Sequence, residues 1–137
     1  MNVPLEAGST DGDYQDVFKA LVIPVIDQFK PELMIISAGF DAHERDPLAR
    51  MRLSTTGYAM LTKSLCDAAD RHCHGRVVAV TEGGYDLTAL KACLESSISI
   101  LDGAAVPPSH EALAGPTSRS RTAIAAVRAA QANYWKL

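Results

Sequence analysis

Apolar residues recur along the chain with two different periods, and these periods predict alternating helices and strands. Three segments carry apolar side chains every three or four positions, as on one face of an amphipathic helix: 14–30, 55–72 and 86–101. Two others, 31–40 and 75–85, contain short continuous apolar runs that end in glycine, which is typical of buried strands. The pattern therefore predicts helix, strand, helix, strand and helix in that order.

This alternation predicts an α/β fold in which helices flank a parallel sheet. The unbroken apolar run 33–36 predicts a strand that is covered on both faces of that sheet. We expect residues 1–104 to form the body of the domain and the Pro-, Ser- and Gly-rich stretch 105–120 to be a connector. Residues 121–137 then form a helix that packs on the same body, with Ile124 and Val127 on its buried side.

Local signals indicate where the helices begin and bend. Asp13 is placed to cap the first helix, and Ser54 or Thr55 begins the second. Pro24 lies inside the first helical pattern, so it predicts either a kink or the start of a separate helix.

Composition excludes several classes of protein. The chain has 137 residues and a formal net charge of −3, so it lacks the basic surface that nucleic-acid binding requires. No apolar run is long enough to span a bilayer, and the first residues do not form a signal peptide. We therefore expect a cytoplasmic protein that binds neither nucleic acid nor membrane.

The three cysteines predict neither a disulfide framework nor a metal site. His72, Cys73 and His74 are adjacent in the sequence, and adjacent residues on a helix point in different directions. We interpret this stretch as the polar end of a helix that is capped by Gly75.

The candidate chemistry lies after the two predicted strands. In parallel α/β sheets, ligands bind beyond the carboxyl ends of the strands. The first strand leads into Asp41 and His43, and the second into Gly83, Gly84 and Tyr85. Asp41 could ligate a metal, act as a general base or simply cap a turn. An Asp-x-His pair with His43 is a weak metal signal, and His43 could equally be a solvated loop residue.

Tyr85 also has two interpretations. Its hydroxyl could stabilise an oxyanion, or the residue could be a packed turn tyrosine. A serine hydrolase is not indicated, because no G-x-S-x-G motif is present.

Taken together, "NVPL", "PELMIISAGFDAHERDPL", "LSTTGYAMLT" and "GRVVAVTEGGYDLTAL" resemble the C-terminal part of the zinc-dependent histone deacetylase family. The resemblance is greatest to the class II and bacterial branch, which includes acetylpolyamine amidohydrolases. It implies part of an arginase-like α/β fold and a hydrolase that acts on acetylated lysine peptides or acetylated polyamines.

The resemblance also implies roles for individual residues. Asp41 would be one ligand of a catalytic Zn²⁺, and Tyr85 would hydrogen-bond the acetyl carbonyl and its tetrahedral intermediate. His43 has no ligand role in the family, so the resemblance argues against an Asp-x-His metal site. The residues implied to contact substrate are Phe40, Leu48, Gly83 and Gly84, with Leu48 at the mouth of the tunnel.

The chain departs from the family pattern in two ways. "DPLARM" replaces the usual "DPLGG", so Ala49 and Arg50 stiffen and charge a glycine turn. The family's Asp-x-His and His-His elements, which supply the other zinc ligands and the general acid/base groups, have no counterpart among His43, His72, His74 and His110.

We therefore expect a C-terminal deacetylase segment that is inactive in isolation. The alternatives are a non-catalytic binding or assembly module, which self-associates or pairs with an N-terminal partner chain, and a truncated gene product.

Overall fold

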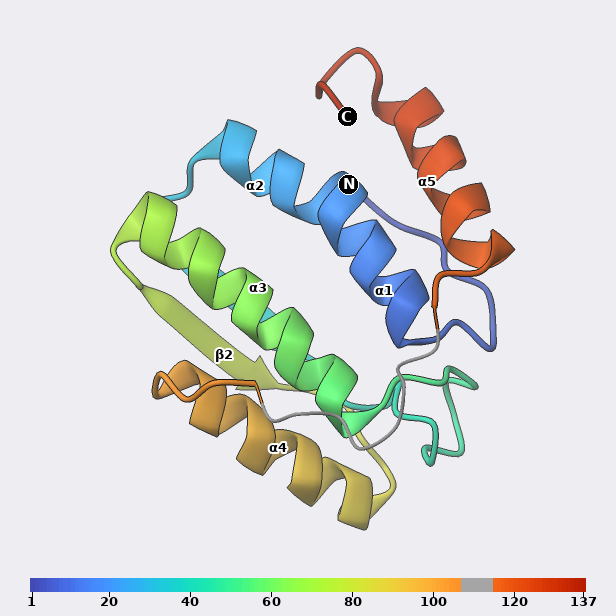
Figure 1. The fold of residues 1–137 in the computed structure, drawn as a ribbon, viewed down its shortest axis with the longest axis vertical. Coiled ribbons are helices and arrows are strands. Elements are labelled where there is room, and N and C mark those ends of the chain that lie inside the picture. Colours follow the sequence, from blue (N-terminus) through green and yellow to red (C-terminus); the bar gives the residue numbers. More distant parts are fainter. Residues whose placement is uncertain (107–114) are drawn as a thin grey trace.

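The computed structural model describes residues 1–106 and 115–137. The helices and strands follow one another as α1 (Asp11–Val17), η1 (Phe18–Val22), α2 (Ile23–Phe29), β1 (Met34–Ala38), α3 (Thr55–Cys73), β2 (Val77–Thr81), α4 (Leu87–Leu101) and α5 (Ser118–Gln131). Figure 1 shows α3 running alongside β2, with α4 on one side of it and α1 and α2 on the other. The predicted order of helices and strands is confirmed.

The first helix runs from Asp11 to Phe29 through a π-helical segment, η1, which directly precedes α2. Pro24 lies in the first turn of α2. Proline has no N–H to donate, and its ring clashes with the carbonyl four residues earlier in a regular α-helix. The wider π turn accommodates that residue, and Pro24 lies at the start of the separately bounded α2, which is one of the two predicted alternatives.

The predicted cap of the first helix was wrong by three residues. Thr10 is the N-cap, and Asp13 occupies the third helical position. Its carboxylate accepts a hydrogen bond from the backbone N–H of Thr10 at 3.0 Å. Asp13 therefore takes the acidic place of a capping box.

Strands β1 and β2 are parallel neighbours, with Met34 opposite Val77 and Ala38 opposite Thr81. Met34 is buried against residues of α3, so this helix covers one face of the sheet. On the other face Ile35 is 69% exposed and its partner Val78 is 49% exposed. The prediction that the strand is covered on both faces is wrong for the part of the chain that the structure describes.

Helix α3 begins where the sequence predicted. Ser54 is its N-cap, and the Ser54 hydroxyl accepts a hydrogen bond from the backbone N–H of Gly57 at 3.0 Å. At its other end the helix closes on His74, whose φ of 54° lies in the left-handed region, and Gly75 follows with φ 72°. The cap residue is thus His74, one position earlier than predicted, and His72 hydrogen-bonds Asp27 at 2.7 Å.

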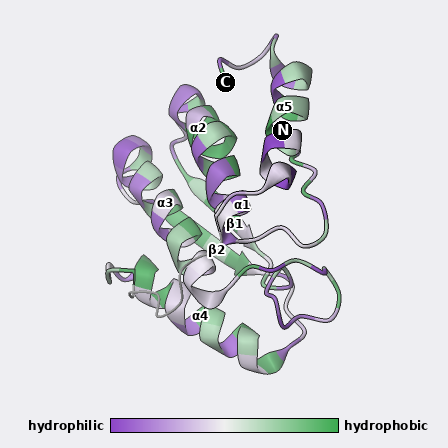
Figure 2. Cartoon of the chain, turned by 45° about the vertical axis from the view of Figure 1, so that its right-hand side comes forward, coloured by the Kyte–Doolittle hydropathy of each residue, from purple (hydrophilic) through white to green (hydrophobic). Residues whose placement is uncertain are grey.

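Helix α5 packs on the first helix. Ile124 and Val127 are buried together with Val17 and Leu21. The prediction that Ile124 and Val127 lie on the buried side of this helix is confirmed. The helix begins at Ser118, three residues before the expected start; part of the expected connector, 107–114, lies outside the described residues. Figure 2 shows hydrophobic strands, whereas the outer turns of α2 and α3 are hydrophilic.

Among residues 1–106 and 115–137, no helix is both long and apolar enough to cross a membrane.

Candidate functional site

The two candidate motifs meet at one end of the sheet. Because β1 and β2 are parallel, the residues that follow them leave the sheet side by side. The backbone N–H of Phe40 donates to the carbonyl of Gly83 at 2.8 Å, and that of Glu82 donates to the carbonyl of Ala38 at 3.1 Å. The stretch that carries Asp41 is thereby joined to the stretch that carries Tyr85.

The carboxylate of Asp41 lies directly over the glycine turn. A Cβ atom at Gly83 would come within 3.0 Å of Asp41 Oδ1 and 3.1 Å of its Cγ, and one at Gly39 would come within 3.0 Å of the same oxygen. A side chain at Gly83 would therefore crowd the carboxylate and force it to shift. Gly84 is required for a different reason, since its φ of 132° lies in a region that other residues rarely adopt.

Two tyrosines from neighbouring helices lie near the stretch that carries Asp41. Tyr58 of α3 donates a hydrogen bond to the carbonyl of Gly39 at 3.2 Å. Tyr14 of α1 is partly buried, and its burial together with the charge of Asp41 raises the pKa of Tyr14 to about 12. Burial likewise raises the pKa of Tyr58, so both phenols stay protonated at neutral pH. Sequence reasoning assigned neither tyrosine to the site.

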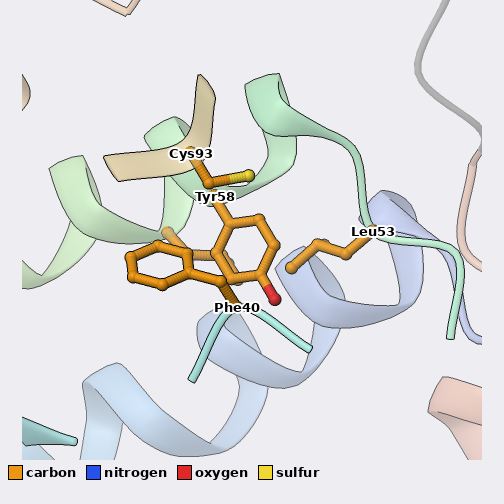
Figure 3. Packing of buried hydrophobic residues seen from close by; sticks show 5 residues of the cluster. Phe40, Leu53, Tyr58 and Cys93 are labelled. Atoms are coloured by element: carbon orange, nitrogen blue, oxygen red, sulfur yellow. The ribbon is translucent and has the colours of Figure 1, made fainter. Parts of the chain in front are cut away.

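Phe40 belongs to the hydrophobic core. It is 4% exposed, and its ring lies 5.1 Å from that of Tyr58, centroid to centroid. Leu53, Leu61 and Cys93 complete the same buried cluster, and Figure 3 labels Phe40, Leu53, Tyr58 and Cys93. The packing of Phe40 fixes the backbone that leads into Asp41, and its contact with substrate stays a prediction.

Asp46 joins the two loops through a single carboxylate. One oxygen accepts from the backbone N–H of Leu48 at 2.9 Å. The other accepts from those of Tyr85 at 2.6 Å and Asp86 at 3.3 Å. Burial alone would raise the pKa of Asp46, but these backbone hydrogen bonds outweigh it and lower the pKa. Sequence reasoning missed this residue, because nothing in the sequence connects positions 39 residues apart.

The side chains predicted to meet substrate differ in exposure. Tyr85 is 58% exposed and Leu48 is 60% exposed, while Gly83 and Gly84 are half-buried. Leu48 and Tyr85 are linked to each other through Asp46. Their contact with a substrate stays a prediction.

His43 is a buried structural residue. Its Nε2 lies 3.3 Å from the hydroxyl of Thr55, and its Nδ1 accepts from the backbone N–H of Arg45 at 3.2 Å. Burial lowers the pKa of His43, which favours the neutral ring. The interpretation of His43 as a solvated loop residue is wrong.

A catalytic zinc needs three protein ligands. Within residues 1–106 and 115–137, no three His, Cys, Asp or Glu side chains lie close enough together to hold a metal ion. Asp41 presents a single carboxylate at the strand end, so the described residues do not fit a complete zinc site.

Comparison with known proteins identifies the family. The histone deacetylase domain model matches residues 1–101. The chain belongs to the histone deacetylase family. It is 39% identical over 103 residues to the histone deacetylase-like amidohydrolase of Pseudomonas aeruginosa, a match that covers 75% of this chain and 27% of that protein. It is 36% identical over 140 aligned positions to the polyamine deacetylase HDAC10 of Homo sapiens, covering 99% of this chain and 20% of the human protein.

Solved structures agree with this assignment. The histone deacetylase Clr3 superposes with a TM-score of 0.87 at 31% identity, covering 99% of this chain and 22% of that one. The HDA15 HD domain superposes with a TM-score of 0.82 at 33% identity, and the match covers 98% of this chain and 35% of that one. This histone deacetylase family chain thus has part of the deacetylase fold and spans about a quarter of the length of the Pseudomonas relative.

Proposed function

We propose that this chain is the C-terminal segment of a zinc-dependent deacetylase, which hydrolyses the amide of acetyl-lysine or of a related acylated amine such as an acetylated polyamine. The observation that carries the proposal is the meeting of the Asp41 carboxylate with the glycine turn that presents Tyr85. The names of the relatives support the reaction class, since they include an amidohydrolase and a polyamine deacetylase.

In this proposal Asp41 is one ligand of a zinc whose other ligands lie outside the described residues. The bound metal would supply the Lewis acid that activates water. The chain's own contribution is to hold the Asp41 carboxylate against Gly83 and to present the Tyr85 hydroxyl to the acyl oxygen. A donor fixed in that place stabilises negative charge as it develops in the transition state.

The test is a chimera, because the proposed site needs ligands from elsewhere. Residues 1–101 of this chain replace the matching segment of the Pseudomonas amidohydrolase, and turnover is measured on an acetyl-lysine peptide and on an acetylated polyamine. We expect Tyr85→Phe to lower kcat by about 100-fold or more while the zinc content is unchanged. We expect Asp41→Asn to lower the zinc content itself.

The isolated 137-residue chain is the matched comparison in the same assay. We expect it to show no turnover that a hydroxamate inhibits. Activity of the isolated chain would contradict the claim that its site is incomplete, and full activity of the Tyr85→Phe chimera would contradict the oxyanion role.

A second candidate is a non-catalytic assembly module. The apolar row Ile35, Val78 and Val80, which is at least 49% exposed, favours it because exposed apolar sheet faces tend to be covered by another chain. Turnover by the chimera would contradict a purely non-catalytic role for the segment.

A further inference from the structure

We propose that Asp46 is the positioning residue for Tyr85: its carboxylate fixes the backbone of the tyrosine and so the place of the phenol at the strand end. The inference deepens the proposed function, because it rests on Tyr85 as the group that meets the acyl oxygen. It is carried by the 2.6 Å hydrogen bond from the backbone N–H of Tyr85 to Asp46 Oδ2. Asp46 is itself only 7% exposed, so this contact is shielded from water.

The backbone around Tyr85 explains why an anchor is needed. Gly83 and Gly84 precede it, and glycines leave a chain more conformational freedom than other residues do. After it, Asp86 caps α4 by accepting from the backbone N–H of Ala89 at 2.8 Å. The tyrosine therefore lies between two glycines and a capped helix end, and Asp46 fixes this junction by accepting from the backbone N–H groups of both Tyr85 and Asp86.

The tyrosine side chain does little to anchor itself. It is 58% exposed, so its own packing leaves much of the ring free. Arg45 adds a second link between the loops, but its ion pair with Asp86 spans 3.5 Å and the arginine is 56% exposed. Such exposed pairs contribute little. Among the described contacts, the carboxylate of Asp46 is thus the main restraint on Tyr85.

The Asp46→Asn variant tests whether the two acceptor oxygens of Asp46 are needed to hold the backbone of Tyr85. Both carboxylate oxygens accept backbone N–H groups, one from Leu48 and the other from Tyr85 and Asp86. Asparagine has one acceptor oxygen, and its NH₂ group would face a backbone N–H on the other side. The variant keeps the size of the side chain but cannot hold both loops.

The experiment is a double-mutant cycle in the chimera described above. We expect Asp46→Asn to lower kcat by about 10- to 100-fold with KM changed by less than about two-fold and zinc content unchanged, since misplacing a catalytic group by about 1 Å costs this much. In the Tyr85→Phe background, the same Asp46→Asn change should lower kcat by less than about two-fold. Glu44→Gln is the control, because this exposed carboxylate lies in the same loop.

A second measurement uses the 137-residue chain alone. We expect Asp46→Asn to speed amide hydrogen exchange at Tyr85 and Asp86 by about ten-fold or more, while amides within α3 keep their rates. Unchanged exchange at Tyr85 would overturn the proposal, as would an equal kcat loss from Asp46→Asn in both backgrounds. Failure of the proposed function looks different: Tyr85→Phe would then have no effect on kcat, whereas the exchange result would stand.

Discussion

At the scale of single residues, the loop between β1 and α3 contains a residue in an unfavourable backbone conformation. Arg50 has a φ of 57°, and its carbonyl accepts from the backbone N–H of Gly8 at 2.8 Å. In an L-residue with a Cβ atom, the left-handed region costs about 1 kcal/mol. Glycine, which the "DPLGG" pattern has at position 50, would avoid that cost. The arginine in "DPLARM" is therefore expected to make the fold less stable.

We expect Arg50→Gly to raise the free energy of unfolding by about 0.5–1 kcal/mol. Glycine removes the left-handed cost but also makes the unfolded chain more flexible, which is why the gain is smaller than the full cost. Urea unfolding followed by circular dichroism measures it. Arg50→Ala is the control, since alanine loses the exposed side chain but keeps the Cβ atom; equal stabilisation by both variants would show that the arginine side chain, not the backbone, is responsible.

Residue-scale chemistry could be predicted from sequence only where it was local. Asp41, Gly83 and Tyr85 stand directly after apolar runs, so their meeting at the strand ends followed from the parallel sheet. The anchor Asp46 could not be found in this way. A hydrogen bond between a loop and a second loop 39 residues later leaves no periodic pattern in the sequence.

At the scale of helices and strands, caps and order were predictable, while contacts between distant helices were not. Ser54 was identified as a helix start because capping is a local property. Asp13 was assigned a local cap, but its buried carboxylate also accepts from the backbone N–H of Thr117 at 2.7 Å and of Ser120 at 3.3 Å. It therefore joins the start of α1 to the start of α5.

The hydrogen bonds of Asp13 predict how the free energy of unfolding depends on pH under acidic conditions. Burial opposes ionisation of Asp13, but hydrogen bonds from Thr10, Thr117 and Ser120 outweigh it and lower the pKa from 3.8 to about 2. Because the folded-state pKa lies below the unfolded one, the stabilisation is present above about pH 4 and is lost as pH falls toward 2. A shift of this size corresponds to about 2 kcal/mol.

We expect Asp13→Asn to lower the free energy of unfolding by about 2 kcal/mol at pH 7, and the difference from the unsubstituted chain to shrink as pH falls from about 4 to 2. Urea titrations at a series of pH values measure both. Asp16→Asn, on the same helix, is the matched control. A stability difference that stays constant down to pH 2 would contradict the role given to the Asp13 carboxylate.

At the scale of the whole molecule, the main departure from expectation is the open face of the sheet. Apolar strands in a parallel sheet normally have helices on both sides, and the apolar run 33–36 predicted such cover; the run indicates that a strand can be buried, but it does not say which segment covers it. Here α3 covers one face, and Ile35, Val78 and Val80 remain exposed on the other. The relatives are roughly four to five times longer than the matched region, which is consistent with a second layer outside the described residues.

We expect this face to make the chain self-associate as its concentration rises. Replacing the cross-strand pair with threonines, as Ile35→Thr and Val78→Thr together, keeps the preference for strand but removes apolar contact area. The dissociation constant should then increase by about ten-fold, equivalent to about 1.4 kcal/mol. Sedimentation velocity over a range of concentrations measures it, and Thr88→Val on exposed α4 serves as a control. A chain that is monomeric throughout would contradict the expectation.

The contact between Asp13 and α5 also affects when the first helix can reach its final environment during synthesis. Thr117 lies 104 residues after Asp13. At about 5–20 residues per second, a ribosome adds Thr117 roughly 5–20 s after Asp13. During that interval Thr10 is the only one of these hydrogen-bond partners of the Asp13 carboxylate that has been synthesised, because helix α5 has not yet been made. The start of the first helix is therefore among the last parts of this chain to reach its final environment.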